Sequence, residues 1–147
     1  MDYRSAFEIS AAGMSLERAR VDVTAMNLAN MHTARTADGS LYQPLRVVAK
    51  SQGLPSFGTR YEALQGGAQL TVPQDVHVEA MQATPRLVHE PGHPQADERG
   101  FVAYPGVNHV GEMVNLVSAL RAYEANVVAM NAAKTMALKA LELGGNT

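Results

Sequence analysis

The chain has 147 residues, a formal net charge of -2 and no cysteine, and only 5% of its residues are aromatic. The length suits one domain, and the charge shows no basic excess of the kind that binds nucleic acid or an anionic membrane. The lack of cysteine excludes disulfides and thiolate chemistry. Sparse aromatic residues disfavour a compact enzyme core and favour a protein built from long helices.

Residues 4–31 predict a long helix with two apolar tracks on roughly opposite sides, at about 100° per residue. One other long helix in the chain cannot cover both tracks, so the pattern predicts partners from other molecules. Gly13 either permits close helix contact or weakens the helix locally. Asn27, Asn30 and the turn-forming residues 32–40 end the helix. The two tracks are Phe7, Ala11, Met14, Arg18, Val21, Ala25 and Leu28, and Ile9, Ala12, Leu16, Ala19, Val23 and Met26.

The middle of the chain predicts short strands and loops. Residues 41–50 favour a strand that Pro44 confines to an edge or splits. Residues 51–67 contain five glycines or prolines and predict a loop. Alternating apolar residues within 68–83 predict a second strand, broken at Pro73. The following 25 residues, 84–108, contain four prolines and three glycines, which exclude a long helix or a central strand and predict an extended connector.

Residues 110–143 predict a second helix, because they contain no proline and only one glycine. Their apolar residues follow the 3–4 spacing of a coiled-coil seam, with one charged interruption. A parallel track of small residues would let another backbone come close. The seam consists of Met113, Leu116, Leu120, Tyr123, Val127, Met130, Lys134, Ala137 and Leu141, and the small track of Ala122, Ala125, Ala129, Ala132 and Met136.

These elements predict a mainly α protein with a small β-rich middle. We expect four segments: an N-terminal helix within residues 1–36, a β-rich segment at 37–83, the extended Pro/Gly-rich connector at 84–108 and a C-terminal helix within 109–147. The sequence contains no run of 18 apolar residues, so it predicts no transmembrane helix. The N-terminus lacks a basic region followed by an apolar block, so we expect no cleaved secretory signal.

Residues 89–93 (HEPGH) contain the residues of a zinc-binding motif but lack the helix that the motif requires. His89, Glu90 and His93 fit H-E-x-x-H, which binds zinc when a helix brings both histidines onto one face. Pro91 and Gly92 interrupt any such helix, so we expect no metal, no cofactor and no catalytic residue. A small metalloenzyme using the two histidines is the alternative from another functional class.

Three stretches resemble the flagellar rod and hook proteins of bacteria. Residues 26–30 (MNLAN), followed by Thr33 and residues 36–39 (TADG), resemble their N-terminal signature. Residues 112–115 (EMVN) and 119–126 (ALRAYEAN) resemble the C-terminal signature. Residues 91–98 (PGHPQADE) and 100–108 (GFVAYPGVN) are similar to a segment of the proximal rod proteins in particular.

The sequence departs from the family pattern at a few positions. Met31 and His32 replace the usual Ala/Asn pair after the first signature. His109 and Gly111 stand where the family more often has Val and Glu, and this difference predicts a weaker first turn of the C-terminal helix. Another flagellar axial protein of the rod or hook, such as a different proximal rod protein or a distal rod protein, is the alternative within the same class.

The resemblance implies a structural subunit of the flagellar basal body. Such subunits are exported by the flagellar type III system without a cleaved signal and assemble in the periplasm into the rod, which transmits torque. The terminal helices would pair as an antiparallel coiled coil. Implied partners are other copies, other rod proteins, the export apparatus and membrane-ring components, and no nucleic acid or small-molecule substrate. The expected assembly residues are Phe7, Ile9, Met14, Leu16, Val21, Val23, Asn27, Leu28, Asn30, Met113, Leu116, Leu120, Tyr123, Val127, Met130 and Leu141.

Overall fold

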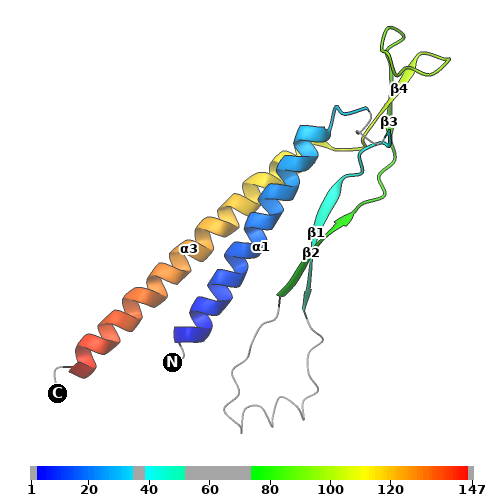
Figure 1. The fold of residues 1–147 in the computed structure, drawn as a ribbon. Helices are drawn as coiled ribbons and strands as arrows, with labels where there is room; N and C mark the ends of the chain where they lie inside the picture. Colours follow the sequence, from blue (N-terminus) through cyan, green and yellow to red (C-terminus); the bar gives the residue numbers. More distant parts are fainter. Residues whose placement is uncertain (1–2, 35–38, 52–73, 146–147) are drawn as a thin grey trace. The chain divides into compact units, whose positions relative to one another are not determined.

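A computed structural model describes residues 3–34, 39–51 and 74–145. Two long helices and a small β-rich middle confirm the expected mainly α class (Figure 1). The expected turn at residues 36–38, the loop at 52–67 and the strand break at Pro73 lie outside the described residues. The elements, in chain order, are α1 (Tyr3–Asn30), β1 (Leu45–Ser51), β2 (Gln74–Ala80), β3 (Arg86–His89), β4 (Phe101–Tyr104) and α3 (His109–Gly145).

The chain divides into two compact units, and both long helices contribute to each. Unit 1 comprises Met1–Arg18, Ala49–Val76 and Leu120–Thr147, and unit 2 comprises Ala19–Val48 and His77–Ala119. Among the described residues, the buried side chains differ in kind between the units. Those of unit 2 include Val23, Val102, Tyr104, Pro105 and Ala119, whereas those of unit 1 are Ser10, Glu17 and Ala133.

Asn30 ends α1 by bonding back to its own helix. Its Nδ2 donates to the Met26 carbonyl at 2.9 Å, and its Oδ1 accepts from the Thr33 hydroxyl at 3.4 Å. Backbone bonds from Met31 to Leu28 and from Thr33 to Asn30 close the last turn. Asparagine competes for backbone groups in this way and therefore favours helix ends. The observed end agrees with the predicted one to within a residue.

Asn108 caps the start of α3. Its Oδ1 accepts from the Gly111 amide at 3.1 Å, and its carbonyl accepts from the Glu112 amide at 2.9 Å. Asparagine is a preferred cap because its side-chain oxygen bonds to an amide that lacks a partner within the helix. The negative charge of Glu112 in the first turn also suits the positive end of the helix dipole. The Asn108 cap thus stabilises the first turn of α3 at Gly111, although the sequence predicted that this glycine would weaken the turn.

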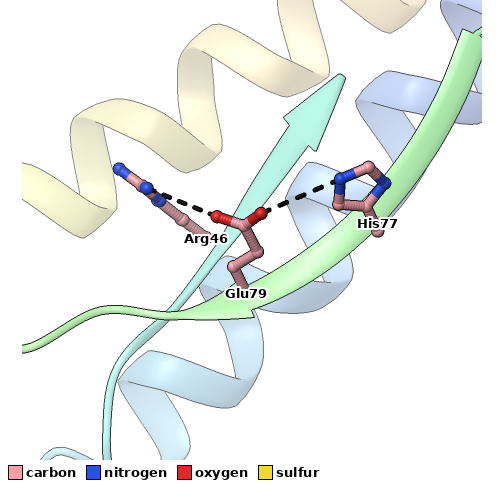
Figure 2. A network of polar contacts seen from close by, with 3 residues as sticks. All are labelled: Arg46, His77 and Glu79. Atoms are coloured by element: carbon pink, nitrogen blue, oxygen red, sulfur yellow. Dashed lines mark hydrogen bonds and ion pairs between the residues drawn. The ribbon is translucent and has the colours of Figure 1, made fainter. Parts of the chain in front are cut away.

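β1 and β2 form a two-stranded sheet. β1 begins directly after Pro44, which has no amide to donate but whose carbonyl accepts from the Met81 amide at 2.7 Å. Polar side chains also link the strands: Glu79 lies between Arg46, at 3.3 Å, and His77, at 3.8 Å (Figure 2). Because the Arg46 and Glu79 side chains are 59% and 39% exposed to solvent, this pair contributes at most about 1 kcal/mol.

The extended connector predicted at residues 84–108 is not confirmed, because a β-hairpin occupies most of this segment. β3 and β4 pair antiparallel, with Val88 opposite Val102. Asp97 organises the loop, since its Oδ1 accepts from two backbone amides at 2.9 and 2.8 Å. Gly100 has a φ of +80°, a conformation that glycine adopts readily. The four prolines precede, follow or lie between the strands, so they leave the ladder intact.

Candidate assembly surfaces

Asn27 is buried in unit 2, with 1% of its surface exposed. Its Oδ1 accepts from the Leu45 amide at 2.8 Å and from the Tyr42 hydroxyl at 2.9 Å. Its Nδ2 donates to the Leu45 carbonyl at 2.8 Å and, at 3.4 Å, to the Glu112 carboxylate. A side-chain amide has two donors and two lone pairs, so this network uses its full capacity. Asn27 thereby connects α1, the residues that enter β1, and α3.

Breaking such a network destabilises the fold, because each buried polar group left without a partner lowers the free energy of unfolding by about 1–3 kcal/mol. The sequence predicted Asn27 as an assembly residue, and the structure gives it partners within its own chain. Its role between chains stays a prediction. Tyr42, Leu45 and Glu112 were not predicted as its partners, since no sequence pattern connects residues so far apart.

Tyr42 has a pKa raised above its ordinary value of 10.0. Burial is the larger cause, because removal of water disfavours the phenolate, and the Glu112 carboxylate raises the pKa further by repulsion. The hydroxyl of Tyr42 therefore keeps its proton well into the alkaline range. That proton is the one donated to Asn27.

In unit 1, α1 and α3 approach closely at Gly13. A Cβ atom at this position would lie 2.8–2.9 Å from the side-chain atoms of Asn126, closer than real Cβ atoms come. The Asn126 amide also donates to the Ala122 carbonyl of its own helix at 3.0 Å. Of the two roles that the sequence left open for Gly13, this geometry supports close helix contact.

The predicted assembly residues of α1 differ in exposure. Val23 and Asn27 are buried, Ile9 is 55% exposed, and the rest are partly covered. The most covered positions also include polar residues seven apart, and together these form a 3–4 repeat that a search for apolar residues does not detect. The partly covered predicted residues are Phe7, Met14, Leu16, Val21, Leu28 and Asn30. The 3–4 repeat consists of the buried Ser10, Glu17, Thr24 and Asn27 and, between them, the partly covered Gly13 and Arg20.

On α3, the predicted seam coincides only partly with the covered side. Leu116, Val127 and Met130 are partly covered, whereas Met113, Leu120, Tyr123 and Leu141 are exposed. The most covered residues are alanines, with 0% of Ala119 and 4% of Ala133 exposed. The covered column is one residue before the predicted column of Met113, Leu120 and Val127, and it consists of Glu112, Ala119, Asn126 and Ala133.

The opposite side of α3 exposes large apolar side chains. Val110, Val114, Val117 and Val128, here termed the outer valine row, are 70%, 62%, 53% and 67% exposed. Their successive spacings of four, three and eleven residues place them on one side of a helix with 3.6 residues per turn. The charged pair Arg121 and Glu124 lies on this same side between Val117 and Val128. Large apolar side chains exposed together on one side of a helix indicate a candidate contact with another molecule.

The chain is similar to flagellar rod proteins along almost its entire length. Residues 98–143 match the family described as flagellar basal body rod FlgEFG protein, C-terminal. The basal-body rod protein FlgC of Escherichia coli O6:H1 is 39% identical over 138 residues, which cover 94% of this chain and 95% of the relative. The FlgC proteins of Bacillus subtilis and Borreliella burgdorferi are 38% and 34% identical, and cover 92% and 95% of this chain and 94% and 95% of their own lengths. The chain belongs to the FlgC family.

Membership of the FlgC family makes this chain a structural subunit of the bacterial flagellar basal-body rod. This confirms the family that the terminal signatures and residues 91–108 resemble. It also decides against the other rod and hook proteins that the sequence left as alternatives. The segment matched as the shared C-terminal family, residues 98–143, contains the entire outer valine row.

The H-E-x-x-H sequence of this FlgC-family chain lies on a hairpin. His89 ends β3, and its ring contacts Phe101 edge-on at a centroid distance of 5.0 Å. The Nδ1 of His93 accepts from a loop amide at 3.1 Å, and Glu90 accepts from the Tyr104 hydroxyl at 3.0 Å. Within residues 3–34, 39–51 and 74–145, no three His, Cys, Asp or Glu side chains cluster as metal ligands would. Over the same ranges, no helix has the length and apolar character needed to span a membrane.

Proposed function

We propose that this chain is a non-enzymatic subunit of the proximal rod, built into it through its two long helices. The helices pair antiparallel within the chain, and the outer side of α3 packs against further copies and other rod proteins. The export apparatus and the membrane ring are the remaining partners. The resemblance to rod proteins supports export by the flagellar type III system without a cleaved signal, a periplasmic location and transmission of torque.

Two contacts support antiparallel pairing. In unit 2, Asn27 bonds to Glu112, and in unit 1, Gly13 meets Asn126. Between these contacts, the position on α1 falls by 14 residues (27 to 13) and the position on α3 rises by 14 (112 to 126). Equal steps in opposite directions are the register of an antiparallel pair, and 14 residues make two heptads.

The outer valine row is the observation on which the packing between subunits rests. Its side chains lie opposite the covered column of α3, so the helix pair leaves them exposed. Burying one exposed valine is worth roughly 1.5 kcal/mol or more. A row that repeats along the helix adds this contribution at each contact with a neighbour.

Aspartate substitutions test this packing. Val117→Asp combined with Val128→Asp places two charges in the outer valine row, and we expect loss of motility in soft agar and loss of rods from purified basal bodies. The control, Ser118→Asp with Asn131→Asp, adds the same two charges at exposed positions of α3 outside both the row and the small track, and we expect it to assemble. Normal rods from the valine variant would contradict the proposal, as would equal loss in the control.

No contact in the hairpin favours the alternative of a metalloenzyme. His89 and Glu90 already have partners there, and His93 accepts from the loop backbone. Metal analysis of the purified protein tests this alternative directly, because a catalytic zinc would co-purify in near-equal amount with the chain.

A further inference from the structure

We infer that matched side-chain size and polarity along the covered seam, which comprises the 3–4 repeat of α1 from Ser10 to Asn27 and the covered column of α3, select one register for the helix pair. Gly13 with Asn126 in unit 1 and Asn27 with Glu112 in unit 2 are the selecting pairs. The inference rests on the proposed antiparallel pairing and adds the residues that choose among its alignments.

The rest of the covered seam gives little preference between alignments. On α1 its most covered positions, Ser10, Glu17 and Thr24, recur every seven residues, and the alanines Ala122 and Ala129 of α3 are also seven apart. A slip by one heptad would therefore superimpose similar positions. Apolar burial is non-directional, so it does not distinguish the two alignments. Selection has to come from side chains that fit in one alignment only.

The sizes of Gly13 and Asn126 allow these residues to face each other in only one alignment of the two helices. In the observed register, the Asn126 side chain occupies the space where any other residue at position 13 would place its Cβ. Moving this side chain aside would break its hydrogen bond to the Ala122 carbonyl. A slip of seven residues would put Asn126 opposite Ala6 or Arg20, whose side chains fill that space. It would also put Gly13 opposite Ala119 or Ala133 and leave a void. Both results are unfavourable in a close-packed interface.

Asn27 can donate a hydrogen bond to a side chain of α3 in only one alignment of the two helices, the one that places it opposite Glu112. A slip in one direction would place Asn27 opposite Ala119, which offers no side-chain acceptor. A slip in the other direction would place it opposite residue 105, before the start of α3. In both cases a buried donor loses its partner on α3. Buried asparagines are known to fix the register of helix pairs in this way.

Engineered cysteine pairs can report the register, because the natural chain has no cysteine. Ala6→Cys with Ala133→Cys lies one heptad beyond the Gly13–Asn126 contact and should form a disulfide. Ala6→Cys with Ala140→Cys reports a slip, since seven residues of helix span about 10 Å and a disulfide needs Cβ atoms about 4 Å apart. Both pairs are oxidised in purified basal bodies and separated on a non-reducing gel.

We expect the first pair to run as a cross-linked monomer in most chains and the second to stay reduced. Adding Gly13→Ala should shift cross-linking from the first pair toward the second. Combining Gly13→Ala with Asn126→Ala should restore cross-linking of the first pair. Gly111→Ala is the matched control, because its Cβ would approach Asn108 only to 3.4 Å, and should change nothing.

The remaining outcomes distinguish failure of the register inference from failure of the antiparallel pairing. Equal cross-linking of both pairs, or a Gly13→Ala variant that keeps the full signal of the first pair, would overturn the selection of register and leave the helix pairing standing. Disulfides that join two chains, or none in either pair, would overturn the antiparallel pairing within the chain and this inference with it.

Discussion

Asn27 illustrates what a sequence signature does and does not reveal about a residue. The signature at residues 26–30 located it correctly near the end of α1. Its partners Tyr42, Leu45 and Glu112 lie 15, 18 and 85 positions away. Nothing local in the sequence predicts them, because they come together only when the chain folds. The same holds for Gly13, whose neighbour Asn126 belongs to the other end of the chain.

Asn27→Asp should lower the free energy of unfolding by roughly 2–3 kcal/mol at neutral pH, because it replaces a buried donor with an oxygen facing Glu112 and the Leu45 carbonyl. Burial and the like charge of Glu112 raise the pKa of the new carboxyl above its unfolded value. The stability of the variant is therefore greatest at low pH and is lost as pH rises through the raised pKa.

Urea unfolding at several pH values measures both effects. Adding Glu112→Gln to Asn27→Asp removes the like charge and supplies a donor, so it should recover part of the loss at neutral pH. A variant of Asn27 whose stability matches the natural chain at every pH would contradict the role given to this amide.

Tyr42 gives a prediction at alkaline pH. Because its folded pKa lies above 10.0, its contribution to stability is fully present below pH 10.0 and is lost as pH rises through the raised value. Absorbance of tyrosinate follows this titration. Tyr42→Phe should remove one late-ionising phenol, and Glu112→Gln should make that phenol ionise earlier. Unchanged late titration in Tyr42→Phe would exclude this assignment.

Among the elements, the long helices were predictable and the hairpin was not. Helix propensity and periodicity are local properties, and the predicted ranges 4–31 and 110–143 agree with α1 and α3 to within two residues. The prolines and glycines of 84–108 indicated breaks in structure but concealed strands of only four residues. The covered column of α3 was also missed, since its alanines and polar residues do not stand out in an apolar pattern.

Gly106→Ala should destabilise the base of the β3–β4 hairpin by roughly 1–3 kcal/mol. Its Cβ would collide with the carbonyl oxygen of Thr84, and backbone atoms do not move aside as a flexible side chain does. Gly92→Ala in the hairpin loop is the matched control, because a Cβ there meets nothing within 4 Å. Urea unfolding compares the two variants, and equal midpoints would show that the close approach of Gly106 is unimportant.

For the whole molecule, the two units differ in what holds them together. Unit 2 buries Val23, Val102 and Tyr104, whereas the buried side chains described in unit 1 are Ser10, Glu17 and Ala133. Large apolar side chains contribute more on burial than small or polar ones. Within the described residues, unit 1 therefore gains less from apolar burial inside the chain than unit 2 does.

Deleting this chain should interrupt the flagellum at the rod. Basal bodies purified from cells that lack it should retain the membrane rings but have no rod or hook, because each later part of the structure is built on the rod. Electron microscopy of these particles, with the natural chain restored as the control, measures the outcome. Complete rods with hooks in the deletion strain would refute a place in the proximal rod.

The outer valine row also governs how the free chain behaves in solution. Exposed apolar surface attracts other exposed apolar surface, and a net charge of -2 provides little electrostatic repulsion against it. We therefore expect the free subunit to have poor colloidal stability. Sulfate and phosphate strengthen apolar association, so purification calls for dilute protein and low concentrations of these salts. The same side chains that we propose to be buried between subunits should therefore make the separate subunit prone to aggregate, which light scattering at increasing protein concentration would measure.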